Sequence, residues 1–453
     1  MATTRSFLSF LRSAGIILLS LGGLLAAAPA AFSSADEQGD GIVNALDLGA
    51  TYLTSVQGTY PGDDLVNPGP PGKWVSYSAI PNVWEWDAGT GYAYANTWGA
   101  TALGLLVASQ ASGNTAGLAA AIAYADDIAD DYHDSGNFPR SQTAPFLTDI
   151  ELLTRVGTTG CTCTATNWFS NLPPAVDFAD RTIDGSISRG NGDLAGWDIA
   201  VDISGALVSG HFDYACELAK RVIQRRADWE GSSPADLQDW WGVLSEGGLA
   251  NSLSLVQAAD EDGDCGDFSA DIRGYRDALI ARQSGPNISP YTGIDVNGAI
   301  EAKYAGESFW GVQQNAFGLL GLVGSGKDMT PADAEAAAKV AAYLLRAQYP
   351  AGTGPVIAGD PRNADGAWPV YPYYWLDYSN MEIDGEALYA LALARQHGIE
   401  PQAASDEDAD ETSDLRAEGG KHSSRARDNK RETRLRSQGS EPAFSQAGPP
   451  IAH

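Results

Sequence analysis

The stretch NMEIDGEALYALAL, residues 380–393, places three acids in front of an almost wholly apolar run. Glu382 and Glu386 stand four residues apart, so in a helix they share one face, where like charges repel. The positive end of the helix dipole stabilises an acid at a helix start by roughly 0.3–1 kcal/mol, but it does not explain a second acid on the same face. Such a pair predicts a functional site that holds a cation, a shared proton or a sugar.

Acids also begin other apolar segments of the chain. Asp198 and Asp202 repeat the four-residue spacing, and Asp149 and Asp239 stand at comparable positions. Hydrolysis of a glycosidic bond needs two carboxyl groups, one that donates a proton and one that stays ionised as base or nucleophile. The acids therefore predict a glycoside hydrolase, provided that the fold brings these segment starts together.

Roles can be assigned from the neighbours of each acid. Glu382 lies between Met381 and Ile383, and apolar surroundings raise the pKa of a carboxyl group, so we predict that Glu382 is the acid. Asp198 or Asp202, held ionised near a helix start, is the predicted base. The remaining catalytic candidates are Asp149, Asp239 and Asp384.

Aromatic and amide side chains accompany the acids. Tryptophan and tyrosine present flat apolar faces with a polar edge, which suits the faces and hydroxyl groups of sugar rings. The predicted substrate-binding residues are Trp98, Trp197, Trp241, Trp310, Gln314, Trp368 and Trp375. Few cationic side chains accompany them, which favours a hydrolase over a lyase that binds uronates. Two alternatives stay open, a terpenoid-cyclase-like protein and a non-catalytic protein that binds a carbohydrate or another small molecule.

One stretch resembles a calcium-binding loop. DEDGDCGDFSAD, residues 260–271, places aspartates at alternate positions before a helical pattern, as oxygen ligands for Ca²⁺ require. The predicted ligands are Asp260, Asp262, Asp264 and Asp271. Cys265 occupies the position where such a loop has its turn glycine, and a solvated turn is the alternative.

Two kinds of helical pattern alternate along the chain. Amphipathic patterns with one polar stripe predict outer helices, and these cover residues 45–57, 116–134, 175–186, 214–229, 269–283 and 331–349. Patterns that are apolar on nearly every side and rich in Gly and Ala predict buried inner helices, and these cover residues 96–110, 147–157, 196–210, 236–256, 309–326 and 382–398. Thr330 followed by Pro331 is typical of a helix start.

Six outer/inner pairs predict an all-α protein, an (α/α)6 toroid in which the inner helices stand parallel at the centre. An open α-solenoid is the alternative, but fully apolar inner helices favour closure. The N-terminal ends of the inner helices then meet around one opening. The candidate acids and tryptophans stand at these ends, so we expect an acidic, tryptophan-lined central cavity.

Three segments end in the same way, YLTSVQ at Gln57, ALIARQ at Gln283 and YLLRAQ at Gln348. After the third comes the Gly-x-Trp sequence of residues 366–368. This pattern resembles the repeats of squalene cyclases and prenyltransferases, and the resemblance implies the α/α toroid of the terpenoid cyclases. It does not imply their chemistry, because the Asp-x-Asp-Asp motif and the zinc ligands of those families are not recognisable.

The ends of the chain differ from its middle. Residues 1–35 show the basic start, apolar run and small residues of a secretory signal peptide, and residues 401–453 have the polar composition of a disordered tail. The toroid is therefore expected over residues 36–400, secreted or periplasmic, with no membrane span after the signal is removed.

The net charge and the cysteine content limit which binding partners and cofactors are expected. A formal net charge of −30 speaks against binding of nucleic acid or of an anionic membrane, which attract basic surfaces. Four cysteines in an exported chain allow up to two disulfides in three possible pairings, and zinc is the alternative for Cys161 and Cys163. The expected partner is a glycan or another small-molecule substrate, and Ca²⁺ is the expected cofactor.

Overall fold

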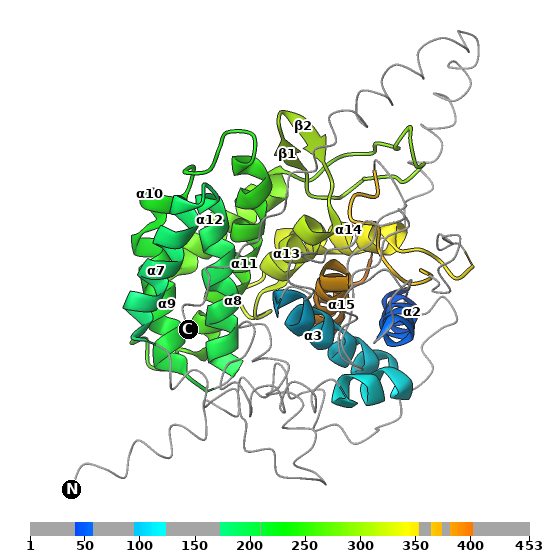
Figure 1. Ribbon diagram of the computed structural model, residues 1–453, viewed down its shortest axis with the longest axis horizontal. Helices are drawn as coiled ribbons and strands as arrows, with labels where there is room; N and C mark the ends of the chain where they lie inside the picture. Colours follow the sequence, from blue (N-terminus) through cyan, green and yellow to red (C-terminus); the bar gives the residue numbers. More distant parts are fainter. Residues whose placement is uncertain are drawn as a thin grey trace, which may run out of the picture. The chain divides into compact units, whose positions relative to one another are not determined.

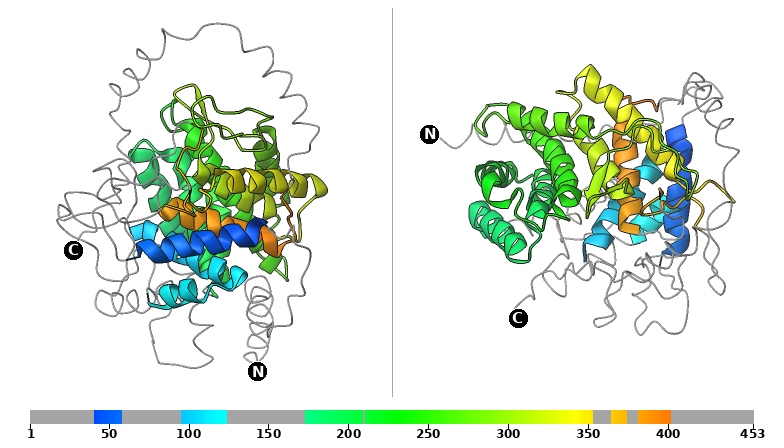
Figure 2. Two further views of the ribbon diagram at one scale, coloured as in Figure 1. Left: turned by 90° about the vertical axis from the view of Figure 1, so that its right-hand side faces the viewer. Right: turned by 90° about the horizontal axis from the view of Figure 1, so that it is seen from above.

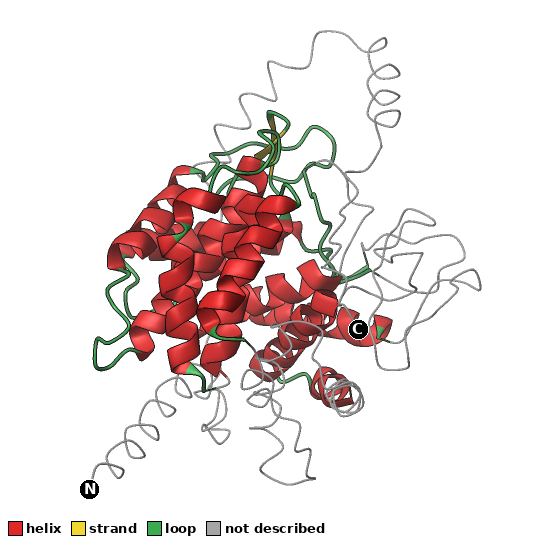
Figure 3. Ribbon diagram, turned by 60° about the vertical axis from the view of Figure 1, so that its left-hand side comes forward, coloured by secondary structure: helices red, strands yellow, loops and turns green. Residues whose placement is uncertain are grey.

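The computed structural model describes residues 41–57, 95–123, 173–208, 210–352, 364–373 and 381–401 (Figure 1). All of them belong to a compact unit that ends at Pro401. They form α-helices, one short 3-10 helix and one small β-hairpin, as Figure 3 shows by colour. The predicted all-α class is confirmed. No helix within these ranges is both long enough and apolar enough to span a membrane.

The inner helices contact one another in chain order. They are α3 (Ala95–Ser112), α8 (Ala195–Val208), α11 (Gln238–Ala259), α13 (Val312–Val323) and α15 (Met381–Gln396). Helix α8 packs on α11, α11 on α13 and α13 on α15, and α15 returns to α3, the first of the set. The inner helix predicted at 147–157 lies outside the described residues. The return contact from α15 to α3 closes the ring on that side and favours a toroid over an open solenoid.

Most of the described outer helices contact two inner helices. The outer helices are α2 (Gly41–Val56), α7 (Ala175–Ser188), α9 (Phe212–Gln224), α12 (Ser269–Ala281) and α14 (Pro331–Ala347), and residues 115–123 are also helical. Helix α2 contacts α15 and α3, α9 contacts α8 and α11, and α14 contacts α13 and α15. Figure 2 shows α2 lying beside α15 in both views. The predicted alternation of outer and inner helices, and with it the (α/α)6 toroid, is confirmed in this part of the chain.

The apolar core falls into two clusters of buried side chains. The larger joins α2, α3, α13, α14 and α15 with the first half of α11. The smaller joins α7, α8 and α9 with the second half of α11 and the start of α12. Cys216 on α9 and Cys265, in the loop after α11, form a disulfide within the smaller cluster. Cys161 and Cys163 lie outside the described residues.

Glycines bring the first and last inner helices into backbone contact. A Cβ atom on Gly385 of α15 would lie 2.5 Å from the carbonyl oxygen of Ala100 on α3, and one on Gly104 would collide with the backbone of Gly385. The Thr101 hydroxyl donates to the carbonyl of Met381 at 3.0 Å. Only glycine leaves room for this approach, since any side chain at either position would separate the helices.

The three glutamines of the repeat-like pattern link neighbouring outer helices. The Nε2 atoms of Gln57, Gln283 and Gln348 donate to the carbonyls of Ala120, Ala336 and Ala45 at 3.0, 2.8 and 2.9 Å. Each glutamine follows the end of one outer helix, and each acceptor lies early in another. The third bond spans 303 residues of sequence and joins α14 to α2. The resemblance to terpenoid-cyclase repeats therefore marks a structural device of the outer ring.

Trp368 belongs to the same device. Its indole N–H donates to the carbonyl of Leu344 at 2.7 Å, and its backbone N–H donates to Asp384 Oδ1 at 2.7 Å. Gly366, in the left-handed region at φ 91°, directs its carbonyl to Gln348 Nε2 at 2.9 Å. The Gly-x-Trp sequence thus ties α14 to the first turn of α15.

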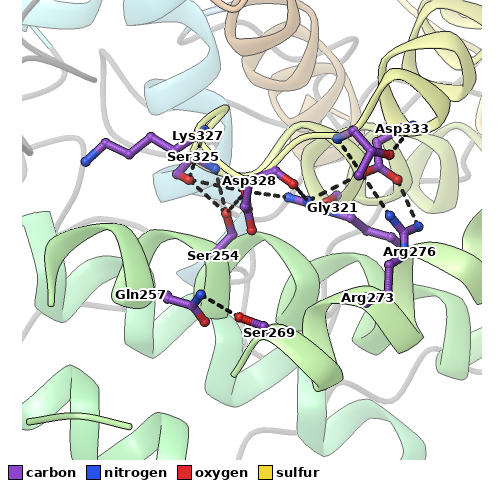
Figure 4. A network of polar contacts seen from close by, with 11 residues as sticks. Ser254, Gln257, Ser269, Arg273, Arg276, Gly321, Ser325, Lys327, Asp328 and Asp333 are labelled. Atoms are coloured by element: carbon purple, nitrogen blue, oxygen red, sulfur yellow. Dashed lines mark hydrogen bonds and ion pairs between the residues drawn. The ribbon is translucent and has the colours of Figure 1, made fainter. Parts of the chain in front are cut away.

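Two arginines of α12 hold the loop between α13 and α14 (Figure 4). Arg276, 1% exposed, donates to the carbonyls of Gly321 and Asp328 at 2.9 and 3.1 Å, and Arg273 donates to Asp333 at 3.0 Å. Burial alone would raise the pKa of Asp333, but hydrogen bonds from Arg273 and Thr330 outweigh it and hold that pKa below its usual range. Thr330 and Asp333 form a capping box, which confirms the predicted helix start.

A β-hairpin precedes α13. Strands β1 (Ala302–Tyr304) and β2 (Glu307–Phe309) pair antiparallel, with Lys303 opposite Ser308. The two turn residues, Ala305 and Gly306, both have positive φ, 50° and 81°, as a tight hairpin turn requires. This element was not predicted, because its strands are only three residues long and show little alternation.

The close contact between α3 and α15 generates a first prediction. Gly385→Ala forces a methyl group against the backbone of α3, so we expect the free energy of unfolding to fall by at least about 1–3 kcal/mol. Urea unfolding followed by circular dichroism measures the loss. Gly274→Ala on α12 is the matched control, because a Cβ there meets nothing within 4 Å, and we expect it to stabilise the protein by about 0.5–1 kcal/mol. Equal effects at both positions would contradict the proposed contact.

The bond from Gln348 to Ala45 generates a second prediction. Gln348→Leu removes the hydrogen-bond donor of the carbonyls of Ala45 and Gly366. We expect the free energy of unfolding to fall by about 1–3 kcal/mol. Because the bond joins α14 to α2, hydrogen exchange should quicken in α2 well before it does in α8. Gln224→Leu, at an exposed position on α9, should change stability by less than about 0.5 kcal/mol. Unchanged exchange in α2 would show that the glutamine does not hold this helix.

Candidate functional site

A cavity of about 120 Å³ lies between the inner helices. Its lining residues come from all five described inner helices and include Leu103, Val201, Leu255, Phe317 and Leu393. Most of them lie in the middle or C-terminal half of their helix. This cavity is largely apolar and lies further along the helices than the helix starts. The expected acidic, tryptophan-lined opening at the N-terminal ends is a different place in the ring and stays a prediction.

One stripe of α15 faces this cavity. Glu386, Tyr389, Leu393 and His397 line it at intervals of three or four residues, which places them on one side of the helix. Glu382 precedes Glu386 by four residues and so lies on the same stripe, one turn nearer the helix start. Both glutamates are only 5% exposed. The pair noted in the sequence therefore faces the centre of the ring, and Glu386 belongs to the site although only Glu382 was among the catalytic candidates.

Asp384 lies on the opposite side of α15. It is fully buried, and its Oδ1 accepts the backbone N–H of Trp368. A shift of two residues along a helix rotates a side chain by more than half a turn, which separates Asp384 from the glutamates on either side of it. The hydrogen bond between Asp384 and Trp368 holds the fold together at this point, and the predicted catalytic role of Asp384 and substrate-binding role of Trp368 stay predictions.

The two aspartates of α8 also turn away from the cavity. Val201, Ser204 and Val208 line it, whereas Asp198 accepts a hydrogen bond from the Ser186 hydroxyl of α7 at 3.2 Å. The pKa of Tyr214 on α9 is raised mainly by the burial of its hydroxyl group and in smaller part by the negative charge of Asp202, which lies nearby. The structure thus places the predicted base on the side of α8 that meets the outer helices.

Asp239 at the start of α11 anchors the hairpin. It accepts hydrogen bonds from Arg282 and from the backbone N–H of Lys303. Glu246, two turns further on, faces the same arginine. Burial raises the pKa of Glu246, and the positive charge of Arg282 opposes that shift. Asp239 therefore fixes the hairpin over the start of α11, and the structure gives it no place at the cavity.

The tryptophans divide in the same way. Trp197 lies one turn before Val201 on the cavity stripe of α8, is buried, and packs edge-on against Phe317 with ring centroids 5.7 Å apart. Its indole N–H has no hydrogen-bond partner within the described part of the chain. Trp241 is half-buried and stands seven residues, or two turns, before Gly248 of the lining. These two are the predicted substrate-binding tryptophans that the structure places toward the ring centre.

The other predicted binding residues differ in their surroundings. Trp310 donates to the Ser284 hydroxyl at 2.6 Å and packs on Tyr373. Gln314 is buried, and its Nε2 makes no hydrogen bond to any described residue. The remaining candidates, Asp149, Trp375 and the side chain of Trp98, lie outside the described residues.

An aromatic cluster at the hairpin was missed in the sequence. Trp240, Tyr304, Phe309 and Tyr371 pack edge to face, with the ring centroids of Trp240 and Phe309 5.2 Å apart. The residues come from α11, both strands and the loop before α15. The one indication in the sequence was Trp240 itself, which directly precedes the predicted binding residue Trp241.

The predicted calcium ligands do not converge. Both carboxylate oxygens of Asp260 accept backbone N–H groups, from Asp264 at 3.1 Å and Cys265 at 2.9 Å. Asp271 lies on α12, 3.9 Å from Arg226. Across the described ranges no three His, Cys, Asp or Glu side chains are grouped so as to hold a metal ion. In place of the predicted calcium loop, the connection between α11 and α12 is shaped by the disulfide at Cys265 and by the turn that Asp260 caps.

Comparison with known proteins adds little to this geometry. No family model matches the chain, and no curated protein matches it. A crystal structure described as that of a possible member of the GH105 family, from Salmonella enterica subsp. enterica serovar Paratyphi A str. ATCC 9150, aligns with 83% of this chain and 97% of its own, at 13% identity and a TM-score of 0.44. A likeness at that level says nothing about activity, so function has to be argued from the residues themselves.

Proposed function

We propose that this protein is a glycan-active enzyme, a glycoside hydrolase, and that Glu382 and Glu386 carry its acid–base chemistry. The observation that supports the proposal is their shared stripe on α15. Both carboxyl groups are buried, and they stand one helical turn apart on the same side of α15. A pair that holds one proton and one charge is the requirement for protonating a leaving oxygen while activating an attacking group.

The neighbours of this pair suit a sugar. Trp197 offers an indole N–H that lacks a partner in the described chain, and Trp241 stands on the corresponding stripe of α11. Gln313, four residues before Phe317 and half-buried, presents an amide one turn above the cavity lining. Aromatic faces, an amide and two carboxyl groups on the centre-facing sides of four inner helices would match the apolar faces and hydroxyl groups of a sugar ring in the predicted opening.

Export forms part of the proposal. Residues 1–35 lie outside the described residues, and the signal peptide stays a prediction. The disulfide between Cys216 and Cys265 supports it, because disulfides form and persist in oxidising compartments. An exported hydrolase would meet its polysaccharide outside the cell or in the periplasm.

The test is hydrolysis by the full chain. Release of reducing ends is measured over a panel of soluble polysaccharides, and the variants Glu382→Gln and Glu386→Gln are compared on the glycan that gives the highest rate. We expect each to lower kcat/KM by about 10²–10⁴-fold, as the loss of an acid or base does. Glu335→Gln, at an exposed position on α14 where Glu335 pairs with Lys339, is the control and should leave the rate unchanged.

Two results would contradict the proposal. Turnover that survives in both glutamine variants would show that other groups perform the chemistry. Glycan binding by the wild-type chain with no release of reducing ends on any polysaccharide would instead identify a carbohydrate-binding protein that uses the same opening.

A further inference from the structure

The central cavity carries an inference that the proposed activity does not use. Its lining is mostly Ala, Val, Leu and Phe. A sugar in this space would leave several hydroxyl groups without partners, at a cost of about 1–3 kcal/mol for each buried group. The apolar part of the lining therefore suits an apolar molecule better than a sugar, while Glu386 and a few other polar side chains also line the cavity.

Asn251 supplies a polar atom in the middle of this apolar lining. It stands on α11, lines the cavity and is 7% exposed. Its carbonyl oxygen Oδ1 is buried and accepts no hydrogen bond from any described residue. A buried acceptor without a donor is costly, and a ligand that brings an N–H or O–H group to this oxygen would remove that cost.

The far end of the cavity is held in place. Gly324, Ser325 and Lys327 line it there, and Figure 4 shows how their loop is fixed. Ser325 donates its backbone N–H to the Ser254 hydroxyl at 2.9 Å, and that hydroxyl donates to Asp328 at 2.8 Å. Arg276, buried behind the loop, donates to Asp328. The cavity is thus largely formed before any ligand enters, which lowers the cost of binding.

His397 closes the lining beside this loop. Its Nε2 is buried and has no hydrogen-bond partner among the residues described, and burial lowers its pKa. Gly326, at φ 74°, lies against the imidazole so closely that a Cβ would overlap the ring. The imidazole therefore stands neutral at physiological pH beside the apolar lining and adds no charge to repel an apolar ligand.

We propose that the cavity is a binding site for a neutral one-ring alcohol or phenol, whose ring occupies the apolar lining and whose hydroxyl donates to Asn251 Oδ1. The size agrees, because an apolar protein cavity of about 150 Å³ takes up benzene and this one measures about 120 Å³. The lining includes Glu386 of the proposed catalytic pair, but the site differs from the Glu382–Glu386 chemistry in its ligand class and in the residue that selects the ligand.

Phenol and anisole are the two probes, since they share the ring and differ in the hydroxyl donor. Binding to the full chain is measured by titration calorimetry and by the shift of melting temperature. We expect phenol to bind about two- to tenfold more tightly than anisole, the range that one hydrogen bond supplies. Methyl NMR signals of Leu255 and Leu320, which line the cavity, should shift with phenol, a readout that needs no substitution.

Two variants separate the parts of the site. Asn251→Leu removes the acceptor and keeps the volume, so phenol should bind it no more tightly than anisole does. Ser204→Phe, at a half-buried lining position, should fill the cavity and abolish binding of both probes. Val176→Phe, at an exposed position on α7, is the control and should bind both as the wild type does.

Each contrary result overturns the proposal. Absence of phenol binding to the wild-type chain, or equal affinity for phenol and anisole, would show that water or nothing occupies the acceptor. A preference for phenol that persists in Asn251→Leu would place the hydroxyl elsewhere. Should Ser204→Phe fail to fold, unshifted Leu255 and Leu320 methyl signals in the wild type would be decisive against this cavity.

Discussion

The ring depends on the contact between its first and last inner helices. Gly104 and Gly385 allow α3 and α15 to meet backbone to backbone, and the Thr101 hydroxyl joins them. Without that contact the apolar sides of both helices would face water, because neither has a polar stripe to expose. The bond from Gln348 to Ala45 repeats the closure on the outside of the ring. Everything at the centre, including the cavity and the stripe of α15, takes its position from this closure.

Helical phase decides which acid has a structural task and which can do chemistry. Within one turn of α15, Asp384 faces outward to Trp368 while Glu382 and Glu386 face the centre. The same division separates Asp198 of α8 from Val201, three residues away. An acid at a helix start can therefore either bond to a neighbouring element or face the ring centre. Its position around the helix axis decides which of the two it does.

The helices and their order could be predicted from the sequence because they follow from periodicity alone. Within the described residues the amphipathic segments form outer helices and the apolar segments inner ones, and the glutamines at 57, 283 and 348 each follow the end of an outer helix. The orientation of single side chains could not be predicted in the same way. Asp198 and Asp239 start inner helices as expected, but their bonding partners, Ser186 and Arg282, come from outer helices whose rotation the sequence does not reveal.

The location of the cavity also lay beyond sequence reasoning. A central hollow follows from closure, but its depth depends on which side chains fill each level of the ring. Trp197 and Phe317 pack against each other near the helix starts, while Gly324 and Ala258 leave room further along. The position of the cavity along the inner helices depends on the volumes of the side chains that each helix contributes. A repeat pattern in the sequence does not give those volumes at each position.

The disulfide between Cys216 and Cys265 affects how this protein unfolds. It closes a covalent loop across a sequence separation of 49 residues that contains the whole of α11, and it lies in the smaller of the two apolar clusters. Such a loop limits the disorder of the unfolded chain by about 4 kcal/mol of free energy in the chain-entropy description. In an oxidising medium the disulfide therefore adds to the stability of this cluster. Reduction removes that contribution, so the resistance of the smaller cluster to local unfolding depends on the redox state of the medium.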